Sequence, residues 1–217
     1  YTQPWAGSLV PMQESGDIIL GNIFLPHGKY LLKVWTSGPN NQIDGNDLND
    51  TLRRWITVCD MMSGTFTIGG AGSDYPDIMS AVSDLNSCGV GGPVTFQIQP
   101  GLYEERIILD EINGVSDSNR IIFQSSSGIA GDVVIAYAAG GSGDNWVWRL
   151  NGADYITIKD LTLRSTALST YGRVLELTNG ASHNLITGNI VESIPGSSSS
   201  AASCIYSGNS SDHSNVI

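Results

Sequence analysis

The chain has 217 residues and a net charge of −11, from 10 basic and 21 acidic side chains. This length buries a sizeable core without metals or disulfides, and the negative charge argues against nucleic acid or anionic lipid as a partner, since both bind basic faces. Only 14% of the residues are charged and 41% are hydrophobic, beside 26 Gly and 27 Ser. That balance excludes a disordered chain or a helical bundle and indicates a secreted β-protein.

The cysteines Cys59, Cys88 and Cys204 are spaced too widely to suggest a disulfide framework or a zinc site. We expect buried free thiols, with a Cys59–Cys88 bridge as the alternative. No run approaches the roughly 20 apolar residues of a membrane helix, so direct membrane insertion is not expected. The chain shows no signal peptide and stops at Ile217 within a strand-like pattern, and we interpret it as a piece of a longer chain.

Short β-type runs with turn signals roughly every 8–12 residues fill residues 1–62, which is typical of a β-sandwich. Strands are predicted over Lys29–Trp35 and Trp55–Val58. The stretch Leu-Pro-x-Gly-x-Tyr-x-Leu-x-Val-Trp from Leu25, followed by Asp-x-Asn-x-x-Asn-Asp from Asp44, resembles the last strands of immunoglobulin-like adhesive modules in large bacterial surface proteins. The resemblance implies a partial immunoglobulin-like sandwich.

Residues 44–50 are dense in oxygen-bearing side chains, which Ca²⁺ prefers as ligands. The candidate ligands are Asp44, Asn46, Asp47 and Asp50, in a site that would brace the junction between the two modules. The spacing departs from the EF-hand pattern, and Asp and Asn also form turns with their own backbone. A plain turn is therefore the other interpretation, and no other cofactor is indicated.

The second part of the chain opens with a pattern that predicts a capped solenoid. Residues 77–87 form a helix that Asp74 or Pro76 opens and whose apolar face is Ile78, Ala81, Val82 and Leu85. Phe-x-Ile-Gly-Gly from Phe66, this helix, a strand, and Pro-Gly-x-Tyr-x-Glu from Pro100 resemble the start of a right-handed parallel β-helix of the pectin-lyase-like superfamily. In that superfamily the helix caps the solenoid, whose apolar end needs a cover.

An internal repeat supports the solenoid independently. Residues 151–161 align with 179–190, and a third copy begins at Ser211, so that Tyr155, Asn184 and Asn215 lie 29 and 31 residues apart. The predicted inner positions are Leu150, Ile156, Ile158, Leu161, Leu177, Leu185 and Ile190. The predicted parallel ladders are Val94–Ile98, Ile121–Gln124, Val133–Tyr137, Trp146–Leu150 and Val174–Leu177. The chain is thus predicted to be all-β: a partial immunoglobulin-like sandwich over 1–62, then a helix-capped right-handed parallel β-helix over 63–217.

No catalytic residue is predicted in these coils. Glycan cleavage needs two converging acid/base groups or a metal beside a base, whereas the equivalent positions Asp154, His183 and Ser214 form no acid pair, and the histidines lack Ser or Asp partners. Lys159 and Arg164 are predicted to share a solenoid face as exposed charges. We therefore expect no polysaccharide cleavage by this chain alone.

Trp146 and Trp148 are the candidate glycan-contact residues. They flank Val147, so the alternation of a strand predicts both rings on one side. Core filling is the default interpretation, and a sugar-stacking platform is the functional one.

As a whole the chain resembles repetitive cell-surface proteins of Bacteroidetes-type bacteria, which are linked to type IX secretion and gliding motility. The resemblance implies a secreted structural or adhesive surface protein that binds polysaccharide or neighbouring surface proteins. The alternative is a polysaccharide lyase, esterase or hydrolase whose catalytic coils lie beyond Ile217. A structural stalk without a ligand is the third interpretation.

Overall fold

A computed structural model describes residues 4, 6–7, 13–38, 51–168, 170–194, 200–208 and 211–217. The chain divides into two compact units, residues 1–59 and 60–217. The sequence predicts the division after Met62. In the structure Met62 belongs to the second unit, because it begins strand β3 (Met62–Ile68), which pairs in parallel with β4 (Val90–Ile98).

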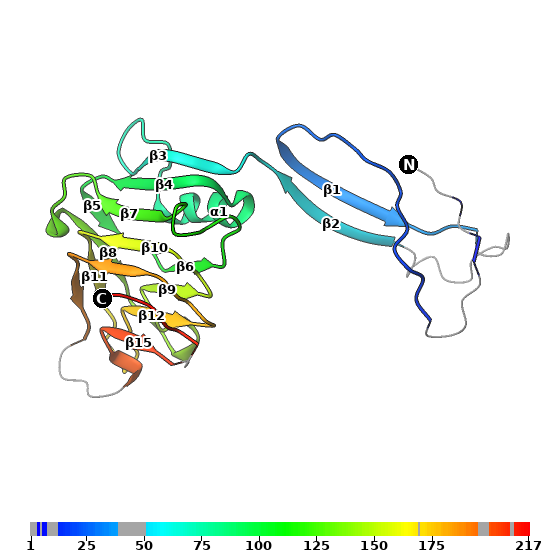
Figure 1. Cartoon of the computed structure of the whole chain (residues 1–217). Helices are drawn as coiled ribbons and strands as arrows, with labels where there is room; N and C mark the ends of the chain where they lie inside the picture. The colour runs from blue at the N-terminus through cyan, green and yellow to red at the C-terminus, as the bar shows by residue number, and fades with distance from the viewer. Residues whose placement is uncertain are drawn as a thin grey trace. The chain divides into compact units, whose positions relative to one another are not determined.

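The described part of the first unit contains a two-stranded antiparallel ribbon (Figure 1). Strand β1 (Gly28–Trp35) pairs with β2 (Thr51–Val58) along its whole length. Tyr30 is half-buried on one face, and its hydroxyl donates a hydrogen bond to the carbonyl of Pro26 at 2.9 Å. A single ribbon does not define a sandwich, so the immunoglobulin-like assignment remains a prediction.

The described part of the second unit is built around three parallel sheets (Figure 1). The first coil sheet contains β3, β4, β7 (Ile121–Ser125), β10 (Ile156–Lys159) and β13 (Leu185–Thr187). The second coil sheet contains β5 (Gly101–Tyr103), β8 (Val133–Tyr137), β11 (Thr162–Ser165) and β14 (Ile190–Glu192). The third coil sheet contains β6 (Ile107–Asp110), β9 (Trp148–Asn151), β12 (Leu175–Thr178) and β15 (Ile205–Ser207). Short 3₁₀ turns lie at Ala130–Asp132, Ser142–Asp144 and Ser200–Ala202.

Every pairing between these strands is parallel, and from β4 onward each coil contributes one strand to each sheet. Strands β4, β5 and β6 form one coil, and β7, β8 and β9 form the next. This is a parallel β-helix, as the sequence predicts. The five predicted ladders are confirmed as parallel pairings, although two of the strands begin later than predicted, β9 at Trp148 and β12 at Leu175. They are distributed over the three sheets, since the polypeptide turns twice within each coil.

The predicted cap is helix α1 (Ile78–Cys88), which packs against β3 and β6. Asp77 opens the helix, because its side chain accepts a hydrogen bond from the backbone N–H of Ser80 at 2.8 Å. The prediction of Asp74 or Pro76 in this position is wrong. The predicted apolar face is confirmed, since the buried helix residues are Ile78, Ala81, Val82 and Leu85.

Glu105 also stabilises the start of α1. Its carboxylate accepts hydrogen bonds from the backbone N–H groups of Ile78 at 3.2 Å and Met79 at 2.8 Å. Burial raises the pKa of Glu105, and these two hydrogen bonds oppose the rise. A raised pKa favours the protonated form in the folded state, so the contribution of Glu105 to stability is fully present below pH 4.5 and is lost as the pH rises through the folded-state pKa.

The stability advantage of the wild type over Glu105→Gln is therefore expected to shrink as the pH rises from below 4.5. Glutamine retains the shape of the side chain but does not titrate, so the other carboxylates cancel in the comparison. Urea unfolding of both proteins over a pH series measures the difference. An advantage that grows with pH would contradict the assigned direction of the shift.

Aromatic side chains stack through the core along successive coils. The rings of Phe96 and Phe123 are stacked with centroids 4.8 Å apart, and Phe66 lies 5.8 Å from Phe96. Trp148, on the third coil sheet, meets Phe123 edge-on at 5.1 Å. Aromatic residues therefore link two of the sheets across the core.

The offset between the aligned repeats is 28 residues rather than 29, because β10 pairs with β13 as Thr157↔Leu185 and Ile158↔Ile186. Leu185 is only half-buried and Ile190 is 44% exposed, so both predicted inner positions are wrong. A slip of one residue turns every side chain to the opposite face, and Ile186 takes the inner position. The other predicted inner residues are buried: Leu150, Ile156, Ile158, Leu161 and Leu177.

Asparagine side chains tie neighbouring coils together at the turns. Asn184, which is 1% exposed, accepts from the backbone N–H of Ile156 at 2.8 Å and donates to the carbonyl of Ala153 at 2.9 Å. Asn215 makes the same two bonds to Asn184 and Ala181 one coil later. The predicted equivalence of Asn184 and Asn215 is confirmed, and Tyr155 instead corresponds to His183, both with φ of 57°.

The cysteines do not follow the favoured prediction. Cys59 and Cys88 are disulfide-bonded, and Cys204 has a free, exposed thiol. A wide spacing in sequence does not prevent pairing once the chain has folded.

Candidate functional site

A row of polar side chains follows the outer face of the first coil sheet. The pairings Thr67↔Gln97, Gln97↔Gln124, Gln124↔Lys159 and Lys159↔Thr187 place these residues side by side on five successive strands. We call this set the outer row: Thr67, Gln97, Gln124, Lys159 and Thr187. Neighbouring strands lie about 4.8 Å apart, so the row is about 19 Å long.

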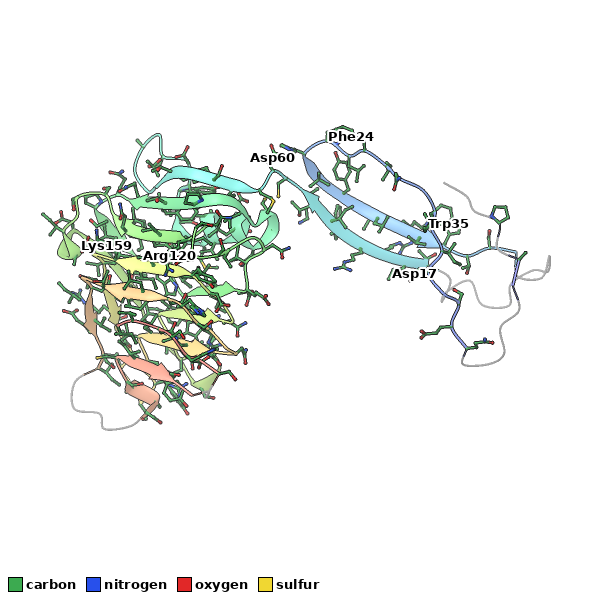
Figure 2. The ribbon with its side chains drawn as sticks, viewed as in Figure 1. Asp17, Phe24, Trp35, Asp60, Arg120 and Lys159 are labelled. Atoms are coloured by element: carbon green, nitrogen blue, oxygen red, sulfur yellow. The ribbon has the colours of Figure 1, made fainter. Side chains whose placement is uncertain are left out.

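The two glutamines at the centre of the outer row are available to a ligand. Gln97 and Gln124 are only half-buried, and their side-chain amides make no hydrogen bond within the described part of the chain. Each amide offers two N–H donors and one carbonyl acceptor. Lys159 continues the row at the surface (Figure 2), with its ammonium 3.4 Å from the carboxylate of Asp160.

The Thr67 end of the outer row opens into a shallow recess. Thr67 lines this recess together with the glycine-rich loop of residues 69–73, Gln99 and Pro100. Asp74 fixes Thr67, because its carboxylate accepts from the Thr67 backbone N–H at 2.7 Å and from the Thr67 hydroxyl at 2.8 Å. These hydrogen bonds hold the pKa of Asp74 below its ordinary value, so the carboxylate stays charged in its place.

A second cluster, on the outer face of the third coil sheet, consists of charged and aromatic side chains. The carboxylate of Glu176 forms ion pairs with Arg149 and with Arg173, the latter at 2.5 Å. The guanidinium carbon of Arg149 lies 3.1 Å from the ring centroid of Trp146, and that of Arg173 lies 3.4 Å from the ring of Tyr206. Because these charges and ring faces are already paired, the cluster is a brace between β9, β12 and β15 rather than an open site.

The structure corrects the interpretation of Trp146 and Trp148 as a stacking platform. Trp146 is 4% exposed and Arg149 covers its ring, while Trp148 is 0% exposed and packs inside against Phe123. The two rings lie on opposite sides, because β9 begins at Trp148 and the alternation does not extend back to Trp146. A sugar needs an exposed ring face, which neither tryptophan offers.

The predicted calcium ligands Asp44, Asn46, Asp47 and Asp50 lie outside the described residues. Within the residues that the structure does describe, no three His, Cys, Asp or Glu side chains gather closely enough to hold a metal ion. Calcium binding at residues 44–50 therefore stays a prediction.

The predicted basic pair does not share a face. Lys159 lies in β10 of the first coil sheet, whereas Arg164 lies in β11 of the second. Arg164 forms an ion pair with Glu192 on the neighbouring strand. Arg164, which the sequence presents as an isolated charge, is therefore paired across adjacent coils, because a parallel stack places residues one repeat apart next to each other.

His183 lies beside a serine and an aspartate, although the sequence suggests no such partners for the histidines. The Ser182 hydroxyl lies 3.0 Å from Nδ1 of His183 and donates to the carboxylate of Asp154 at 2.8 Å. In a catalytic triad the acid orients the histidine, whereas here Asp154 binds the serine. Ser182 is 5% exposed, so this group is a structural turn and not a nucleophile.

Comparisons with known proteins show a likeness of fold. No protein-family model and no curated protein matches the chain. Two structures of a pectin methylesterase from Aspergillus niger, one deglycosylated and one penultimately deglycosylated, match with TM-scores of 0.45 and 0.46 at 13% and 15% identity, covering 60% of this chain. Pectin methylesterase PemA from Erwinia chrysanthemi matches with a TM-score of 0.46 at 12% identity, covering 62% of this chain.

The chain spans less than half the length of these proteins, 43% and 44%. At such identities and scores the likeness carries no activity to this chain, and the parallel β-helix rests on the strand pairings themselves. No helix in the described residues is long and apolar enough to span a membrane.

Proposed function

We propose that the chain is part of an extracellular structural or adhesive protein that binds polysaccharide along the outer row. The observation that carries the proposal is the pair of adjacent, outward-facing glutamines, Gln97 and Gln124, whose amides have no partner in the described part of the chain. Amides bind hydroxyl groups as both donors and acceptors. A polymer rich in hydroxyl groups is the ligand whose chemistry matches the row.

The regular geometry of the row favours a polymer over a small molecule. Equivalent side chains recur about every 4.8 Å along the stack, and the row leads at Thr67 into the glycine-lined recess. A flat, repetitive surface of this kind makes many weak contacts with an extended chain, which add up to useful affinity only when several sugars are bound.

The proposal is tested by affinity electrophoresis of the full 217-residue chain in gels that contain neutral polysaccharides. We expect retardation in at least one neutral polymer, and a dissociation constant about tenfold higher for the double variant Gln97→Ala/Gln124→Ala, since two hydrogen-bonding groups are lost. The matched control is Asn86→Ala, which removes an exposed amide from α1.

Two results would overturn the proposal. One is equal binding by the wild type and the double glutamine variant. The other is turnover: release of methanol from esterified pectin, or of new reducing ends, would favour the alternative of a polysaccharide-active enzyme, the class to which the pectin methylesterases named above belong.

A further inference from the structure

The β1–β2 ribbon of the first unit presents two chemically different faces. On one face the side chains of Tyr30, Val34, Ile56 and Val58 are half-buried. The other face, which we call the basic–aromatic face, is exposed except for Thr51 at its end, and consists of Lys29, Leu31, Lys33, Trp35, Thr51, Arg53, Trp55 and Thr57. Trp35 is 59% exposed and Trp55 is 60% exposed; Trp35 is labelled on the ribbon in Figure 2.

Tryptophans and cations alternate along this face. The pairings Leu31↔Trp55, Lys33↔Arg53 and Trp35↔Thr51 follow one another at every second residue, about 6.6 Å apart. Each lysine lies beside an indole ring: the ammonium of Lys29 is 5.6 Å from the ring centroid of Trp55, and that of Lys33 is 5.2 Å from that of Trp35. A ligand that stacks on either ring therefore meets a positive charge beside it.

The charge of the ribbon is opposite to that of the rest of the chain. The two strands contain four of the 10 basic residues and no acidic residue, whereas the rest of the chain has six basic and 21 acidic residues, of which 16 lie in the second unit and five elsewhere in the first. An anionic ligand is thus attracted to the ribbon and repelled from most of the coil surface.

We propose that the basic–aromatic face binds an acidic polysaccharide, one whose sugars bear carboxylate groups. The exposed rings of Trp35 and Trp55 stack on the apolar faces of sugar rings. Lys29, Lys33 and Arg53 pair with the carboxylates between the stacked sugars. Trp146 and Trp148 cannot stack on a sugar in this way, because both are buried. The proposed site does not depend on the outer row.

The test is titration of the full chain with polygalacturonate, followed by tryptophan fluorescence and calorimetry, with dextran as the neutral polymer. We expect binding to polygalacturonate that weakens as salt is raised because exposed charges are screened, whereas any binding of dextran by the outer row is expected to be unchanged in variants of the basic–aromatic face. The double variant Lys33→Gln/Arg53→Gln is expected to bind about tenfold more weakly, because it loses two charge-assisted contacts. Trp35→Ala/Trp55→Ala is expected to lose affinity by a similar factor of about ten.

The matched control is Arg54→Gln, which removes the neighbouring cation on the opposite face of the ribbon. Its affinity is expected to stay within about twofold of the wild type, since exposed charges away from a site contribute little. The outer-row variant Gln97→Ala/Gln124→Ala is also expected to bind polygalacturonate normally, so failure of the two proposals can be told apart.

Three binding results would overturn this assignment. They are no binding to polygalacturonate, an equal loss in Arg54→Gln, and equal affinity for anionic lipid vesicles, which would show attraction by charge alone. Concentration-dependent dimers abolished by Trp35→Ala/Trp55→Ala would instead show that a second copy of the chain covers the face. Because these residues are exposed, circular dichroism is expected to show unchanged β-structure in every variant.

Discussion

Replacing Trp148 with alanine is expected to lower the free energy of unfolding of the second unit by about 3–5 kcal/mol. The side chain is 0% exposed and its ring meets Phe123 edge-on at 5.1 Å, within the aromatic stack that joins two coil sheets. Alanine leaves a large cavity that the rigid coils on either side cannot close. Urea unfolding followed by far-UV circular dichroism measures the loss.

Trp148→Phe distinguishes packing from polar effects at the same position. The Nε1 group of Trp148 is buried and has no hydrogen-bond partner among the residues that the structure describes, so phenylalanine removes an unsatisfied donor while it keeps an aromatic ring. The loss for Trp148→Phe is expected to be well below half of that for Trp148→Ala. Equal losses in the two variants would show that Trp148 is not a packing residue of the core.

The alternation of apolar residues and the helix signals predict much of the fold from the sequence. Val94, Phe96 and Ile98 point into one core because successive residues of a strand face opposite sides. The apolar face of α1 can likewise be predicted, because its apolar residues recur with the period of a helix. Both patterns involve residues that are close together in the sequence, so the sequence alone is enough to recognise them.

The register between coils is harder to predict from the sequence, because it depends on the conformation of the turns between strands. A one-residue error in aligning residues 151–161 with 179–190 is enough to place Leu185 inside instead of Ile186. The structure fixes the offset through the left-handed residues Tyr155 and His183 and the side-chain bonds of Asn184. The conformational propensity of asparagine does not predict which asparagine side chain will bond to the backbone of the neighbouring coil.

The candidate sites could not be predicted without knowing the registers of the strands. Gln97 and Gln124 are unremarkable as single residues, and become a pair only when β4 and β7 are aligned. The basic–aromatic face had a usable signal, since Lys29, Leu31, Lys33 and Trp35 alternate along one strand with the residues of the opposite face. The burial of Trp146 had no such signal, because it depends on Arg149 folding over its ring.

Glu176→Ala is expected to destabilise the second unit by about 3 kcal/mol or more, the usual cost of removing one partner of a buried ion pair. The side chain of Glu176 is 6% exposed, and it forms ion pairs with both Arg149 and Arg173, which are themselves 25% and 20% exposed. Without the carboxylate, two guanidinium groups are left close together with little water to solvate them.

The second coil sheet provides a matched control, because Arg164 and Glu192 form the same kind of ion pair between adjacent coils, 28 residues apart. Their side chains are 43% and 44% exposed, so Glu192→Ala is expected to cost no more than about 0.5 kcal/mol, and less at high salt. Urea unfolding at low and high salt compares the two variants. Burial, not the presence of an ion pair, is what separates them, so equal losses in Glu176→Ala and Glu192→Ala would show that the Glu176 brace is no more important than a surface contact.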